Sequence, residues 1–140
     1  MAGLKKGALA ADSDSVTYYT IDSTVAVMLG KSVSVQEDTT NGKYINLSGG
    51  GATVAQNSLK LTLTKAGTIT VTATGKNDSN SKYIKLLKSD GSQESIETNA
   101  LAKTTDTPAE YTVEASVAGT YYLGASGDGC RIYGLSITYK

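Results

Sequence analysis

Short segments in which hydrophobic and polar residues alternate recur along most of the chain. In the clearest of them, SLKLTLT (58–64), three leucines share one face while Lys60 lies on the other with two threonines. The segment TITVTAT (68–74) repeats this alternation, with its aliphatic residues on one side and its threonines on the other. Alternation with a period of two residues is typical of β-strands that bury one face. These segments therefore predict strands of a half-buried sheet.

Turn-forming residues separate the predicted strands at regular intervals. The chain contains 15 glycines and 1 proline, and SDGS (89–92) carries an Asp-Gly pair of the kind that closes hairpins. GKNDSNS (75–81) reads as a loop, and no segment keeps a helical period for more than two turns. Many short strands joined by tight turns favour an all-β fold, a two-sheet antiparallel β-sandwich of jelly-roll type. The expected strands fall at about 15–22, 24–30, 32–37, 43–47, 58–64, 68–74, 83–89, 95–98, 110–116, 120–126 and 130–139.

The length of 140 residues fits a single domain with one core. We expect residues 1–14 to form a flexible lead-in and residues 15–140 to form the β-sandwich. The start of the chain has only a short Ala/Leu stretch, too weak for a signal segment or a membrane span.

The last predicted strand contains a conflict of phase. Cys130 and Ile132 share one parity, whereas the hydrophobic residues from Leu135 onward have the other. A strand changes phase in this way only through an extra residue, so we predict a β-bulge at Tyr133-Gly134. If Cys130 and Ile132 face the core, Arg131 and Tyr133 are expected to be exposed together on the outer face.

Composition removes several kinds of chemistry. With 13 basic and 13 acidic residues the formal net charge is zero, so the chain has no global attraction for nucleic acid or anionic membranes. Histidine is absent, which excludes Ser–His–Asp, Cys–His and histidine–zinc sites. The single cysteine, Cys130, is expected to be a buried hydrophobic residue and not a nucleophile.

Basic side chains suggest a binding face. If the strands that carry them were neighbours, these side chains would form a cationic, threonine-rich surface suited to an extended acidic polymer. The arginine guanidinium would bind a carboxylate through two parallel hydrogen bonds. The alternative is an ordinary solvated sheet face whose lysines prevent aggregation. The candidate ligand-binding residues are Lys60, Lys76, Lys82, Lys85, Arg131 and Tyr133.

No cofactor is expected from the motifs. The acidic turns at 12–15, 77–80, 89–92 and 127–129 leave a structural calcium open, but none has EF-hand spacing and such residues are common in tight turns. The glycine-rich GASGDG (124–129) precedes no helix, which argues against a phosphate-binding loop.

One resemblance to a known family emerges from the second half of the chain. The order AGTITVTATGKNDSNSKYIKLLKSDGS, a polar gap and VAGTYYLGASGDGCRIYGLSITY resembles the β-sandwich modules attached to bacterial pectate lyases. It is most similar to the pectin-binding carbohydrate-binding module family 77, over residues 43–140. Members of that family recognise uronate carboxylates with basic side chains instead of a tryptophan platform, and this chain has no tryptophan. By position in the motif, Lys76 or Lys82 and Arg131 would correspond to binding residues, with Lys60 as a further candidate.

The resemblance implies a non-catalytic module that holds an attached pectinolytic enzyme on homogalacturonan or low-ester pectin. It also implies a secreted protein, monomeric as an isolated domain within a larger multimodular enzyme, with no nucleic-acid or membrane partner. Two other functions are open at this stage. One is a ligand-free spacer domain of a secreted or cell-surface protein, since fold alone does not fix function. The other is a small lyase or hydrolase, but the acids lie mainly in turns and not as an aligned pair.

Overall fold

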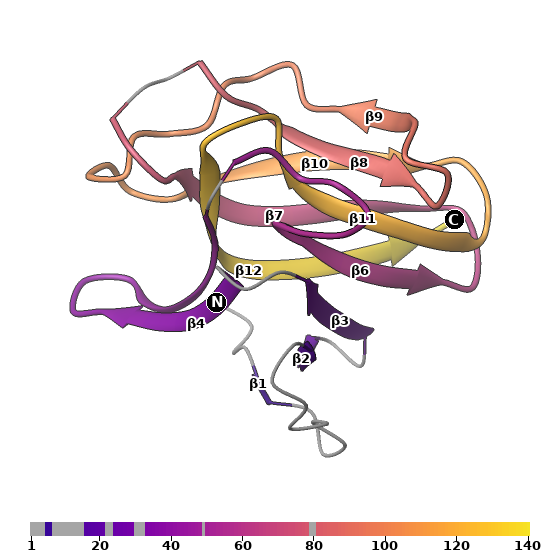
Figure 1. Ribbon diagram of the computed structural model, residues 1–140, viewed down its shortest axis with the longest axis horizontal. Coiled ribbons are helices and arrows are strands. Elements are labelled where there is room, and N and C mark those ends of the chain that lie inside the picture. The colour runs from indigo at the N-terminus through magenta and orange to yellow at the C-terminus, as the bar shows by residue number, and fades with distance from the viewer. Residues whose placement is uncertain (1–4, 7–15, 22–23, 30–32, 49, 79–80) are drawn as a thin grey trace.

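The computed structural model describes residues 5–6, 16–21, 24–29, 33–48, 50–78 and 81–140 of the chain. Within these residues all regular structure is β-strand, arranged in two antiparallel sheets (Figure 1). The predicted two-sheet antiparallel sandwich is confirmed. No helix among the described residues is long and apolar enough to cross a membrane.

The larger sheet has seven strands in the order β1-β2-β3-β6-β11-β8-β9. Its central strand β11 pairs with β6 on one side and with β8 on the other. The strand bounds are β1 Lys5–Lys6, β2 Val16–Ile21, β3 Thr24–Leu29, β6 Ser58–Leu63, β8 Ile84–Lys88, β9 Gln93–Ile96 and β11 Gly119–Ala125.

The second sheet has five strands in the order β10-β7-β12-β5-β4. Its longest strand, β12, pairs with β7 along most of its length and with β5 over residues 129–132. The strand bounds are β4 Val33–Asp38, β5 Gly42–Ser48, β7 Gly67–Gly75, β10 Ala109–Ala115 and β12 Gly129–Tyr139.

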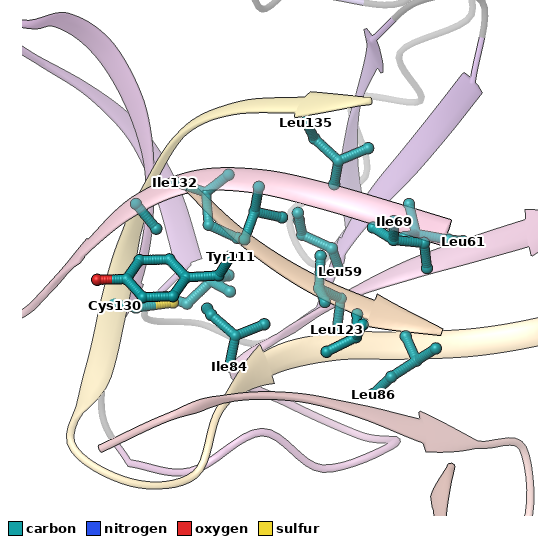
Figure 2. Close-up of a cluster of buried hydrophobic side chains, with 14 of the residues drawn as sticks. Leu59, Leu61, Ile69, Ile84, Leu86, Tyr111, Leu123, Cys130, Ile132 and Leu135 are labelled. Atoms are coloured by element: carbon teal, nitrogen blue, oxygen red, sulfur yellow. The ribbon is translucent and has the colours of Figure 1, made fainter. Parts of the chain in front are cut away.

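The inward and outward faces of the central strands follow the sequence pattern. Alternate residues of β6 and β7 are buried, and the aliphatic side chains of both sheets point toward one another (Figure 2). Burying these side chains is the main driving force for pairing the sheets. The fully buried core includes Ile45, Leu47, Leu59, Leu61, Ile69, Val71, Ile84, Leu86, Leu123 and Ile132.

The predicted bulge in the last strand is confirmed. Ile132 pairs with Ala73 of β7 and Gly134 pairs with Thr72, so Tyr133 is the extra residue between two consecutive partners. The bulge lets β12 bury Cys130 and Ile132 before it and Leu135 after it.

Two segments with similar sequences each contain a strand that precedes a crossing between the sheets. KAGTITVTATG (65–75) contains β7, and VAGTYYLGASG (117–127) contains β11. Each strand then crosses to the opposite sheet, β7 into β8 and β11 into β12. The two crossing loops meet at one end of the sandwich, where the backbone amide of Ser126 donates to the carbonyl of Tyr83 at 2.8 Å.

The remaining predicted segments agree in part. The turn at 89–92 forms as expected between β8 and β9, with Gly91 at φ +88°. The strand expected at about 95–98 runs instead from Gln93 to Ile96. Most of the predicted lead-in, residues 1–4 and 7–15, lies outside the described residues, while Lys5–Lys6 pairs with β2.

Candidate functional site

The predicted binding residues do not converge on one surface. Lys60 and Lys85 lie on the outer face of the seven-stranded sheet, because the residues before and after each lysine are buried and point toward the core. Arg131 belongs to β12 of the five-stranded sheet. The prediction of a single cationic face is therefore wrong, because β6 and β8 pair with β11 and not with β12.

Lys76 and Lys82 lie at the end of the sandwich where the two crossing loops meet. Lys76 follows the last residue of β7 and is exposed. The aliphatic part of Lys82 packs along the turn before β12, with its Cε 3.1 Å from the point that a Cβ on Gly127 would occupy. In the same cluster the Asn77 side chain donates to Asp128 at 3.4 Å. These lysines lie in the loops that border the start of β12, and not within a strand of the sheet that carries Arg131.

Arg131 lies on the outer face of the five-stranded sheet, between β5 and β7. Its Cα partners are Asn46 on one side and Thr74 on the other. Its guanidinium carbon lies 4.7 Å from the centre of the Tyr44 ring, which is within the range of a cation–π interaction. The Arg131 Nε atom is buried and has no hydrogen-bond partner among the described residues. The arginine is thus held by packing against an aromatic ring.

Tyr133 is buried, with 1% of its surface exposed, so the prediction that it is exposed beside Arg131 is wrong. The reason is its packing with residues distant in sequence. Its ring centre lies 5.1 Å from that of Tyr44, and its hydroxyl donates to Asp38 Oδ2 at 2.7 Å. Neither tyrosine belongs to the core between the sheets. Tyr133 therefore supports the outer face from below instead of presenting a free ring.

Hydrogen bonds fix the charge state of this cluster. The hydroxyl of Tyr133, followed by the backbone amides of Asn41 and Thr40, holds the pKa of Asp38 below its usual value. Burial, together with the hydrogen bond to Asp38, raises the pKa of Tyr133 to about 12. At neutral pH the site therefore contains an ionised Asp38, already engaged by these donors, and a protonated Tyr133.

The positive charge of Arg131 is not neutralised by a carboxylate of the described residues. Among the described residues no carboxylate forms an ion pair with it, and it is partly exposed. Asn46 and Thr72 lie on the two adjacent strands, Gln36 lies one strand further out on β4, and all three are at least partly exposed. The Tyr44 hydroxyl donates to the Gln36 side chain at 2.9 Å, which orders that amide as well. We call the surface formed by Gln36, Tyr44, Asn46, Thr72 and Arg131 the Arg131 face.

The Arg131 face offers one oriented cation among amide and hydroxyl groups. A guanidinium grips a carboxylate with two parallel N–H groups, and amides and hydroxyls bind sugar hydroxyls. No group of three acidic or cysteine side chains that would hold a metal ion occurs within the described ranges. The Cys130 thiol is fully buried, which raises its pKa to about 12, as expected for a hydrophobic core residue.

Sequence reasoning missed Tyr44, Asp38 and Asn46. Tyr44 and Asn46 belong to a predicted strand and Asp38 lies one residue past the end of another, but their importance depends on the pairing of β5 with β12, which brings residue 46 beside residue 131. An aromatic residue of outward parity next to inward-facing Ile45 was the available signal for Tyr44.

In comparisons with known proteins, no protein-family model matches the chain and no curated protein matches it.

Proposed function

We propose that the protein is a non-catalytic carbohydrate-binding domain that recognises an acidic polysaccharide, such as homogalacturonan or low-ester pectin, through the Arg131 face. The observation that carries the proposal is the guanidinium of Arg131, fixed on the Tyr44 ring and without a carboxylate partner among the described residues. A natural ligand for such a group is an external carboxylate. The resemblance to pectin-binding modules of pectate lyases agrees with this choice and adds the expectation of a secreted, enzyme-attached domain.

The contacts around Arg131 favour a polymer of sugar acids over a small anion. The face is an open sheet surface bounded by β4 and β7, and its neutral side chains are an amide pair and a threonine. These groups match the hydroxyls of a sugar ring, while a single arginine matches one carboxylate per binding position. Each exposed charge pair stabilises a complex by only about 0.2–1 kcal/mol. We therefore expect weak binding per site that falls with added salt and grows with polymer length.

The test is affinity electrophoresis of the whole chain in gels containing polygalacturonate. The variants are Arg131→Ala, Arg131→Lys and, as a control that removes one exposed charge elsewhere, Lys65→Ala. Highly methylated pectin and a neutral glucan replace polygalacturonate in parallel gels, and each gel is run with and without a chelator. The melting temperature of every variant is measured alongside, because Arg131 also packs on Tyr44.

Retardation by polygalacturonate alone is the expected result for the wild type. Arg131→Ala should weaken it most, and Arg131→Lys should weaken it less because an ammonium keeps the charge but lacks the planar fork. Lys65→Ala should behave as the wild type. Retardation that Arg131→Ala leaves unchanged, at an unaltered melting temperature, would overturn the site. Indifference of the wild type to every polymer would overturn the function and favour the spacer reading.

A further inference from the structure

The outer face of the seven-stranded sheet carries a second, separate group of cationic and aromatic side chains. Lys60 of β6 is the direct Cα partner of Tyr122 in β11. On the other side of β11, Lys85 of β8 is the partner of Gly124, two positions further along the same face. Tyr122 thus lies on the diagonal between the two lysines, and its direct partner on β8 is Leu87. We call the surface formed by Lys60, Thr62, Thr120, Tyr122 and Lys85 the Tyr122 lane.

The lane is accessible, and neither of its lysines has a carboxylate partner in the part of the chain that the structure describes. Lys60 is exposed, and Tyr122 and Lys85 are partly exposed. Among the described residues neither lysine forms an ion pair. The carboxylates of Glu94 and Glu97 are held at the edge of the sandwich, where they accept hydrogen bonds from the backbone amides of Ser116 and Thr112 respectively.

The spacing of the lane suits an extended polymer. Lys60 and Lys85 are separated by two strand intervals and two residues, which places their Cα atoms about 12 Å apart by ordinary sheet geometry. The hydroxyls of Thr62 and Thr120 lie 3.4 Å apart on the next rung beside the tyrosine. Ala52 and Asn57 of the loop before β6 lie over Gly124, the direct partner of Lys85, so the open part of the lane beside Lys85 is on its β8 side. A chain with repeated carboxylates would meet one ammonium, the phenol ring and then the second ammonium.

We propose that the Tyr122 lane is a second binding surface for anionic polysaccharide, so that one molecule bridges two polymer chains. The choice of ligand class rests on the proposed function, but the lane itself rests on different residues. The lane and the Arg131 face belong to opposite sheets, with the hydrophobic core between them. A single rigid stretch of polymer does not reach both surfaces, whereas two chains do. Bridging therefore distinguishes two sites from one.

The experiment measures binding and bridging separately on the whole chain. Binding is read from affinity electrophoresis in polygalacturonate, and bridging from the viscosity of a dilute polygalacturonate solution after protein is added. The variants are Lys60→Ala/Lys85→Ala, Arg131→Ala and the combination of all three. The matched control is Lys65→Ala/Lys103→Ala, which removes two exposed lysines from outside the strands. Analytical ultracentrifugation verifies that the free protein is monomeric, so that bridging cannot come from a dimer.

The wild type and the control should be retarded by polygalacturonate in the gel and should raise the viscosity of its solution. Lys60→Ala/Lys85→Ala should weaken retardation roughly 2- to 30-fold, as expected for two exposed charge pairs, and should abolish the rise in viscosity. The triple variant should lose both. A lane variant that equals the control in both measurements would overturn the lane. If Arg131→Ala behaves as the wild type while the lane variant loses retardation, the Arg131 site fails and the lane remains.

Discussion

The side chain of Ser95 in β9 forms hydrogen bonds with both the backbone amide and the backbone carbonyl of Glu114 in β10. Its hydroxyl donates to the Glu114 carbonyl oxygen and accepts from the Glu114 amide, each at 3.0 Å. β9 and β10 are edge strands of different sheets, so this side chain joins the two sheets where no strand pairing does. An unpaired edge strand is a template for aggregation, and satisfying its amides removes that hazard.

Two glutamates extend the same edge closure. Glu97 Oε2 accepts from the Thr112 amide at 2.8 Å, and Glu94 Oε2 accepts from the Ser116 amide at 3.0 Å. Side chains from β9 and the residue following it thus engage the amides of residues 112, 114 and 116, at every second position along β10 and just past its end. The edge of the five-stranded sheet is closed by side chains in place of a sixth strand.

Ser95→Ala is expected to open this edge at its centre. The loss of one donor and one acceptor should lower the free energy of unfolding by about 0.5–1.5 kcal/mol, because water reaches the freed groups. Hydrogen–deuterium exchange followed by NMR should show faster exchange of the Glu114 amide. Ser136→Ala, on a part-exposed strand position without a side-chain hydrogen bond among the described residues, is the control. An unchanged Glu114 exchange rate in Ser95→Ala would contradict the closure.

The glutamates make the closure sensitive to acid. The hydrogen bond from the Ser116 amide, opposed by burial, lowers the pKa of Glu94 below its ordinary value of 4.5. Burial acts to raise the pKa of Glu97, but the hydrogen bonds from backbone amides, first that of Thr112, outweigh it and the pKa is again lowered. Since the folded protein binds these protons less tightly than the unfolded chain, the stabilisation is complete above pH 4.5 and is lost as the pH falls through the folded pKa values.

Urea unfolding between neutral pH and pH 3 tests this expectation. The wild type should lose stability below about pH 4.5, and Glu94→Gln/Glu97→Gln should lose less over the same interval, because glutamine does not titrate. Asp38 and Asp90 also have lowered pKa values through hydrogen bonds, first from Tyr133 and from Ser92 respectively, so some slope should remain. Glu110→Gln, at an exposed β10 carboxylate, should follow the wild type. Equal slopes in the double variant and the wild type would contradict the assignment.

The sequence predicted what depends on neighbours along the chain. The alternation in SLKLTLT (58–64) placed its leucines inside because burying them on one face stabilises the strand, and the phase conflict at Tyr133 located the bulge. Both are properties of a single strand. The same reasoning correctly assigned Cys130 to the core.

The sequence could not predict which strands lie side by side. The single cationic face failed because Lys60 and Arg131 belong to different sheets, a property of topology that no local pattern encodes. The prediction that Tyr133 is exposed failed for the same reason, since its hydrogen-bond partner Asp38 is 95 residues away in the chain. Parity alone identifies the side of a sheet, but exposure on that side depends on the side chains of the neighbouring strands.

Tyr133→Phe should separate the packing of this residue from its hydrogen bond. The ring contact with Tyr44 is kept, while the pKa of Asp38 should rise toward its ordinary value because the largest cause of its lowering is removed. NMR titration of the Asp38 carboxyl measures this shift. Asp90 is the internal control: a hydrogen bond from Ser92 in a distant turn lowers its pKa, and this pKa should not change in Tyr133→Phe. An unchanged Asp38 titration would contradict the contact.

The same residue should contribute to alkaline unfolding. Burial, reinforced by Asp38, raises the pKa of Tyr133 from 10.0 to about 12, so the folded state holds this proton more tightly than the unfolded chain. Its contribution is fully present below pH 10 and is lost as the pH rises through about 12. Tyr133→Phe should therefore lose less stability between those pH values than the wild type. Tyr111 and Tyr121, whose pKa values burial also raises, should keep the variant from becoming insensitive to pH.

Gly124→Ala is expected to be among the most destabilising single-methyl additions. A Cβ at this position would lie 2.5 Å from the Cβ of Ala52 and 2.8 Å from the carbonyl oxygen of Asn57, both closer than van der Waals contact. The second of these is backbone just before β6, so the loop would have to move away from β11. Overpacking of this kind costs about 1–3 kcal/mol. Gly127→Ala is the matched control, since its added methyl would meet only the flexible end of Lys82. Thermal unfolding should show a clear loss for Gly124→Ala and a small one for Gly127→Ala, and equal losses would show that the loop before β6 yields as easily as a lysine side chain.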